Sequence, residues 1–131
     1  MNRLEQDIRA ALVDVGPGEG GERIARFVFP PGFLGFQGHF PGNPVLPGVC
    51  MIQAVLAALT DGASARVSLS RIVSAKWFAP VKPGEELNFV TRETPAGEGK
   101  AVVKARVTCG GKRVAELALD VVRDPAGKGT P

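Results

Sequence analysis

The stretch that decides the fold reads Gly38-His39-Phe40-Pro41-Gly42-Asn43-Pro44-Val45-Leu46-Pro47-Gly48-Val49, and an apolar run from Cys50 to Leu59 follows it directly. The stretch holds the only histidine of the chain, and its three prolines and three glycines restrict the backbone. Gln53 is the only strongly polar side chain in the apolar run. A stiff loop that presents an imidazole and leads into a buried helix with one polar group indicates a site built around a base.

The apolar run predicts a helix from Val49 to Leu59. Pro47 suits the first helical turn, where its missing N–H costs nothing, and Gly62 is a candidate C-cap. The helix is hydrophobic nearly all round, so we expect it to be enclosed on every side. In a chain of 131 residues the simplest enclosure is a sheet wrapped around the helix.

The flanking sequence supplies mostly strands. The spacing of Leu4, Ile8, Ala11 and Leu12 predicts a short amphipathic helix over Asn2–Val13. We expect a loop over Val15–Gly21 and a strand over Glu22–Phe29, with Arg23, Ala25, Phe27 and Phe29 on the core face. Later strands are predicted over Arg66–Phe78, Glu86–Glu93, Lys100–Thr108 and Arg113–Val122, with a turn at 94–97 and a hairpin turn at 109–112.

These patterns favour one α+β domain over residues 1–122, an antiparallel sheet wrapped around one long central helix. We expect residues 123–131, which are rich in Gly, Pro and charge, to form a disordered tail.

Composition excludes several classes of function. The net charge of +3 comes without a block of consecutive basic residues or a nucleic-acid motif, so we expect no nucleic-acid partner. The charged N-terminus lacks a signal-peptide hydrophobic region, and the apolar run is shorter than the roughly 20 residues of a membrane span. We therefore expect a cytoplasmic protein without membrane contact.

Cys50 and Cys109 are predicted to be free thiols. One histidine and two scattered cysteines do not give the ligand spacing of a metal site, and the sequence shows no sign of a cofactor.

The central stretch resembles the motif of the beta-hydroxyacyl-acyl-carrier-protein dehydratases, hotdog-fold enzymes of fatty acid synthesis. A second block, Ala75-Lys76-Trp77-Phe78-Ala79-Pro80-Val81-Lys82-Pro83-Gly84-Glu85-Glu86-Leu87, is similar to another segment of that family. The resemblance covers roughly residues 20 to 122. It implies a hotdog fold and elimination of water from a 3-hydroxyacyl thioester on acyl carrier protein, or on coenzyme A, to give the trans-2-enoyl thioester. It also implies a homodimer or higher oligomer, with active sites at the subunit interface.

The resemblance assigns roles residue by residue. His39 is expected to be the general base that takes the proton alpha to the thioester, and Gly48 to offer its N–H to the thioester carbonyl oxygen. Phe40, Pro47 and Val49 join Gly48 in the expected substrate-binding set. Gln53 stands where the family carries a Glu or Asp that faces the 3-hydroxyl group.

Gln53 leaves several hypotheses open, because an amide cannot donate a proton and become a stable anion. His39 could act as both base and acid, a water held by Gln53 could deliver the proton, or the substrate could eliminate more easily. None of Asp61, Glu85 and Glu86 is placed at His39 by the motifs. Gln53 could also be a buried amide satisfied by the backbone, which suits a non-catalytic acyl-thioester-binding protein or one subunit of a heteromer. A thioesterase is a further alternative, but that chemistry usually uses a carboxylate on or near the helix.

Two aromatic residues of the second block, Trp77 and Phe78, are expected to pack in the sheet core or at the dimer contact, with a place along the acyl channel as the alternative. Cys50 is expected to be core packing rather than a nucleophile, because no basic neighbour lowers its pKa.

Overall fold

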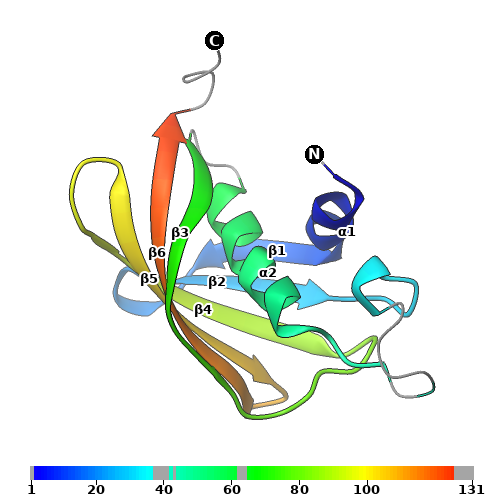
Figure 1. Cartoon of the computed structure of the whole chain (residues 1–131). Coiled ribbons are helices and arrows are strands. Elements are labelled where there is room, and N and C mark those ends of the chain that lie inside the picture. The colour runs from blue at the N-terminus through cyan, green and yellow to red at the C-terminus, as the bar shows by residue number, and fades with distance from the viewer. Residues whose placement is uncertain (1, 37–41, 43, 62–64, 126–131) are drawn as a thin grey trace.

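The computed structural model describes residues 2–36, 42, 44–61 and 65–125 (Figure 1). The elements in chain order are α1 (Arg3–Ala11), β1 (Leu12–Pro17), the 3₁₀ turn η1 (Glu19–Gly21), β2 (Arg23–Val28), the 3₁₀ turn η2 (Leu34–Phe36), α2 (Gly48–Thr60), β3 (Ala65–Trp77), β4 (Glu86–Pro95), β5 (Lys100–Cys109) and β6 (Lys112–Pro125). The six strands pair antiparallel in one sheet of order β1-β2-β4-β5-β6-β3.

The sheet is strongly twisted and curves around one side of α2, while α1 lies beside α2 (Figure 1). The predicted α+β class and the antiparallel sheet are confirmed. A long central helix is not confirmed, because α2 has 13 residues. The short helix predicted over Asn2–Val13 is confirmed as α1, which contacts α2 and buries Ile8 and Ala11.

An aromatic cluster fills the core next to the central stretch. The predicted core face of β2 is confirmed, since Ala25, Phe27 and Phe29 are all nearly inaccessible to solvent. The ring of Phe29 lies 4.7 Å from that of Phe33, which in turn contacts Phe36 at 5.6 Å. These ring contacts hold residues 33–36 against the core, just before the central stretch begins at Gly38.

The prediction of a loop after the first helix is wrong. The first helix ends at Ala11, and the next six residues form β1, an edge strand that pairs with β2. Strand pairing uses backbone groups, so an edge strand can contain glycine and proline. The search for alternating apolar and polar residues does not detect such a strand. Asp14 of β1 also accepts two hydrogen bonds from the guanidinium of Arg26, which holds the strand in register.

The strands at the other end of the chain run further than predicted. Thr94 and Pro95, expected in a turn, belong to β4, and β6 continues through Pro125 into the segment expected to be a tail. Arg123 explains the extension, because Nε and Nη2 donate to the two carboxylate oxygens of Glu93 at 2.7 and 2.6 Å. The rest of the predicted tail, residues 126–131, lies outside the described residues. The predicted turn at Gly110 and Gly111 is confirmed, since both have positive φ.

The ends of α2 also differ from the prediction. Pro47 is the N-cap rather than a residue of the first turn, and Asp61 is the C-cap, with its N–H donating to the carbonyl of Ala57 at 3.0 Å. The predicted cap, Gly62, lies outside the described residues. Within the described chain, no helix has both the length and the apolar character needed to cross a membrane.

The enclosure of α2 is incomplete. Val49 is 59% exposed, and Gln53, Ala57 and Thr60 are half-buried. These four residues recur every three or four positions, so they lie along one side of α2, which we call the open stripe. The expectation that the chain covers this helix on every side is therefore wrong for the described residues.

Candidate functional site

The first turn of α2 presents free backbone donors. Its N-cap, Pro47, has extended backbone dihedrals and no side chain that can accept a hydrogen bond. Among the described residues, the N–H groups of Gly48 and Val49 have no partner, whereas the N–H of Cys50 donates to the carbonyl of Pro47 at 3.0 Å. Free N–H groups and the helix dipole both favour negative charge at this end of α2.

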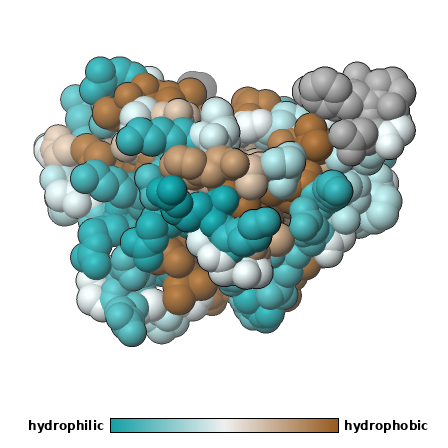
Figure 2. All heavy atoms as spheres, turned by 90° about the horizontal axis from the view of Figure 1, so that it is seen from below, coloured by the Kyte–Doolittle hydropathy of each residue, from teal (hydrophilic) through white to brown (hydrophobic). Residues whose placement is uncertain are grey.

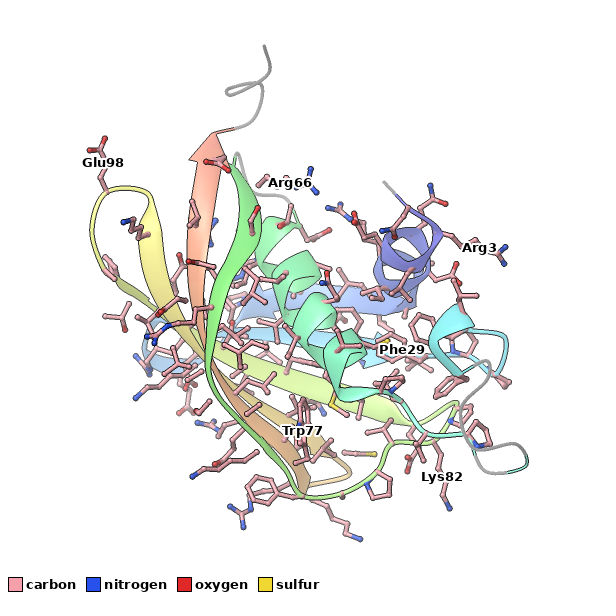
Figure 3. All side chains as sticks on the ribbon, in the orientation of Figure 1. Arg3, Phe29, Arg66, Trp77, Lys82 and Glu98 are labelled. Atoms are coloured by element: carbon pink, nitrogen blue, oxygen red, sulfur yellow. The ribbon has the colours of Figure 1, made fainter. Side chains whose placement is uncertain are left out.

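The two sequence blocks meet at this helix start. The N–H of Leu46 donates to the carbonyl of Val81 at 2.8 Å, which ties the segment before α2 to the segment after β3. The indole of Trp77 packs over Gly48, where an added Cβ would lie 2.7 Å from Cζ2 of the ring. Figure 3 places Trp77 beyond the N-terminal end of α2. A side chain at position 48 would therefore displace the indole of Trp77.

A groove of about 360 Å³, which we call the helix-start groove, opens beside these residues. Its walls are Val45, Leu46, Gly48, Trp77, Phe78, Ala79 and Pro80. Trp77 and Phe78 are 47% and 43% exposed, so they line this groove instead of packing in the sheet core. On the face of the molecule seen in Figure 2, apolar surface lies among hydrophilic side chains.

The guanidinium group of Arg113 lies beside Phe78, a wall residue of the helix-start groove. The guanidinium carbon of Arg113, from β6, lies 4.3 Å from the ring centroid of Phe78, and the chain is held there by a hydrogen bond from the N–H of Phe78 to the carbonyl of Val114 at 2.8 Å. A positive charge therefore comes to this groove from a strand distant in sequence.

Gln53 lies in a second groove, of about 230 Å³, which we call the Gln53 groove. The floor comes from α2 (Gln53, Leu56, Ala57, Thr60) and the walls from α1 (Glu5, Ile8, Arg9) and from residues 66–69 of β3. Figure 3 shows Arg66 beside the end of α2, on the side toward α1. Gln53 is five residues from Gly48, or about 7.5 Å along the helix axis at 1.5 Å per residue. The amide is therefore half-exposed in a polar groove and is not an interior amide of the core.

The structure describes four of the six predicted site residues. Gly48 and Gln53 lie on the same helix and each lines a groove, whereas Pro47 caps the helix. The side chain of Val49 is exposed and lines neither groove. The other two, His39 and Phe40, lie outside the described residues.

Three charged residues of the Gln53 groove carried no site assignment in the sequence. Glu5 and Arg9 come to the Gln53 groove from α1, and Arg66 comes from β3. The apolar spacing of Leu4 and Ile8 predicted the helix that carries Glu5, but not the surface on which that helix docks.

The two cysteines show no features of reactive thiols. Burial raises the pKa of Cys50, which is 2% exposed, so its expected role as core packing is consistent with its surroundings. Burial also raises the pKa of Cys109, and the nearby Glu85 carboxylate acts in the same direction. Among the described residues, no three His, Cys, Asp or Glu side chains are grouped so that they could hold a metal ion.

Comparison with known proteins agrees with the sequence motifs. Residues 18–114 match the family model of the ApeI-like proteins, described as ApeI dehydratase. A 3-hydroxyacyl-[acyl-carrier-protein] dehydratase FabZ of Enterococcus faecalis is 39% identical over 98 residues, which are 64% of this chain and 64% of that relative. The FabZ dehydratase of Lactobacillus helveticus is 38% identical over 102 residues, 71% of this chain and 68% of the relative. The chain thus spans less than two thirds of the length of the Enterococcus relative.

A solved structure shares the fold. The dehydratase heterocomplex ApeI:P from Xenorhabdus doucetiae contains a chain that superposes with a TM-score of 0.71 at 21% identity, covering 86% of this chain and 96% of that one. At 21% identity this structural similarity shows a shared fold and nothing more.

Proposed function

The chain belongs to the ApeI-like dehydratase family, and from that premise we propose that it removes water from a 3-hydroxyacyl thioester on acyl carrier protein, giving the trans-2-enoyl thioester. The observation that carries the proposal is the pair of free N–H groups at the start of α2, with Gln53 further along the same helix. The FabZ relatives support the substrate class, because their names specify a 3-hydroxyacyl group on acyl carrier protein.

Binding begins at the helix start. The thioester carbonyl oxygen accepts a hydrogen bond from the N–H of Gly48, in the groove beneath Trp77. Removal of the alpha proton places negative charge on that oxygen, and the helix dipole and the free N–H groups stabilise it. Because an alanine Cβ would meet the indole, Gly48 lets Trp77 lie against the helix start and form a wall of this groove.

His39 takes the alpha proton in this mechanism. Its unperturbed pKa of about 6.5 leaves it mostly neutral at pH 7, as a base must be. The assignment rests on the sequence motif, since His39 lies outside the described residues. Phe40 belongs to the same part of the proposal.

Gln53 positions the 3-hydroxyl group. Its amide N–H can donate to the hydroxyl oxygen, and its carbonyl can accept from the hydroxyl hydrogen. Neither contact supplies a proton to departing hydroxide, so Gln53 orients the leaving group and another group must protonate it.

The proposal includes a hotdog dimer in which the sheet and a second subunit together enclose α2. The open stripe and the exposed Ile72, Val73 and Trp77 of the edge strand β3 support a partner on this side of the protomer. Cytoplasmic location, and coenzyme A as an alternative carrier, belong to the same proposal.

The heterocomplex named for the Xenorhabdus structure favours a second candidate, in which this chain is one subunit of a heteromer and receives an acid from its partner. In this case the chain alone binds an acyl thioester without turning it over. The half-exposed amide of Gln53 is equally compatible with both assemblies.

The test is to incubate the native protein with 3-hydroxybutyryl-pantetheine and to identify the products by mass spectrometry. The dehydratase proposal predicts the enoyl thioester, with loss of one water and no free thiol. Release of free thiol and hydroxy acid instead would show a thioesterase and contradict the proposal. Tight binding of an unreactive acyl-pantetheine amide without turnover would favour the heteromer subunit.

A further inference from the structure

Elimination of the 3-hydroxyl group requires a proton donor that Gln53 cannot be. Hydroxide is a poor leaving group, and proton transfer to it by a positioned acid typically contributes about 10²–10⁴ in rate. The fold brings one carboxyl group to the groove where Gln53 would hold the hydroxyl. Among the acidic residues of the described chain, Glu5 of α1 is the one that lines the Gln53 groove.

The position of Glu5 is set by the docking of α1. The N–H of Glu5 donates to Oδ1 of the N-cap Asn2 at 2.8 Å, which fixes the first turn. One turn later, Ile8 is 1% exposed and faces α2. Residues three apart lie on the same side of a helix, so Glu5 faces α2 together with Ile8. Its half-buried side chain is thus directed toward the groove by the packing of its own helix.

The carboxylate of Glu5 is not used in a structural interaction within the described chain. Its side chain makes no hydrogen bond and no ion pair there, although Arg9 and Arg66 also line the groove. Of the three other acids weighed in the sequence, Asp61 is exposed at the C-cap of α2, and the other two are engaged elsewhere. Glu85 accepts from the N–H of Lys82 at 2.7 Å, and Glu86 pairs with Arg26 at 3.1 Å.

We propose that Glu5 is the catalytic acid that protonates the departing 3-hydroxyl group, a role that rests on the dehydratase function proposed above. His39 takes the alpha proton, and the C–H electron pair forms the carbon–carbon double bond. The C3–O bond breaks with its electron pair on oxygen, which takes the proton of the Glu5 carboxyl and leaves as water. Solvent then carries the proton from His39 back to Glu5, so the cycle closes without a co-reactant.

Two guanidinium groups, those of Arg9 and Arg66, line the same groove, and within the described chain neither makes an ion pair with Glu5.

The experiment compares the native protein with Glu5→Gln, and with Glu98→Gln as a matched control on an exposed turn far from α1 (Figure 3). Two rates are measured on 3-hydroxybutyryl-pantetheine in D₂O: enoyl formation and exchange of the alpha hydrogens. The proposal predicts that Glu5→Gln lowers enoyl formation by about 10²–10⁴ while exchange, which needs the base alone, stays within a few-fold of native. Adding Gln53→Glu to Glu5→Gln returns a carboxyl to the same groove and restores enoyl formation.

Three outcomes would overturn the proposal. If Glu5→Gln forms the enoyl product at the native rate and His39→Ala does not, Glu5 has no part in a reaction that still takes place. If Glu5→Gln lowers exchange and elimination together and Gln53→Glu restores neither, Glu5 has a structural role. If the native protein shows neither exchange nor elimination, the proposed dehydratase function itself fails.

Discussion

The indole of Trp77 lies directly against the backbone of Gly48, so that a Cβ at position 48 would sit 2.7 Å from Cζ2 and 2.9 Å from Cη2 of the ring. Trp77 ends the edge strand β3, and Gly48 begins α2. The contact thus joins the two motif blocks at the helix start, where the thioester carbonyl is proposed to bind.

Gly48→Ala is predicted to displace the indole. Without a clash, alanine in a helix is favoured over glycine by about 1 kcal/mol. Here we expect a loss of about 1–3 kcal/mol of unfolding free energy, as for other overpacked sites. Trp77 is the only tryptophan, so its emission reports the displacement directly and should shift to longer wavelength. Gly16→Ala is the control, since nothing lies within 4 Å of the added Cβ. Unchanged emission and stability in Gly48→Ala would contradict this contact.

Val73→Lys is predicted to disrupt assembly. Val73 is 48% exposed on the edge strand β3, where the proposed partner subunit covers it, and a buried unpaired charge is costly. Sedimentation equilibrium should show the native oligomer and a monomeric variant. Val13→Lys changes a valine that is 51% exposed at the opposite edge of the sheet and should leave the oligomer intact. Equal masses for both variants and the native protein would place the interface elsewhere.

The pair of Glu93 and Arg123 is predicted to make stability depend on pH. The hydrogen bonds from Arg123 lower the pKa of Glu93 below its ordinary value of 4.5. The pair therefore stabilises the protein above about pH 4.5, and this contribution is lost as the pH falls through the lowered pKa. Urea unfolding should show Glu93→Gln about 1–2 kcal/mol less stable than native at pH 7, with a smaller difference at pH 3. An equal loss of unfolding free energy in Glu93→Gln at pH 7 and at pH 3 would contradict this prediction.

The two thiols are predicted to react in a fixed order. Cys50 is 2% exposed, whereas Cys109 is half-buried at the end of β5. Titration with a thiol-specific disulfide reagent should modify Cys109 slowly in the native protein, and Cys50 only after unfolding. Cys109→Ser should abolish the native-state reaction. Fast labelling of Cys50 in the folded protein would show that the core around α2 opens readily.

The strongly periodic elements could be predicted from the sequence. The core face of β2 and the hairpin at Gly110 and Gly111 followed from alternation and turn chemistry, because their patterns are local. The edge strand β1 could not, since its pairing depends on where β2 lies and not on its own side chains.

The site was only half predictable for the same reason. The motif assigned Gly48 and Gln53 to the proposed site, and both lie on the helix that follows the central loop. Nothing local predicts that Trp77 covers Gly48 or that Glu5 shares a groove with Gln53. Both contacts arise only when β3 and α1 dock against α2.

The most direct measurement is the rate at which the native protein converts a 3-hydroxyacyl thioester to the enoyl thioester, compared with His39→Ala and Gln53→Glu. The account predicts turnover by the native protein, a loss of about 10²–10⁴ in His39→Ala, and at least native activity in Gln53→Glu. Turnover that persists in His39→Ala, or a native protein that stays inactive while Gln53→Glu turns over, would contradict the claim that this chain is itself a working dehydratase.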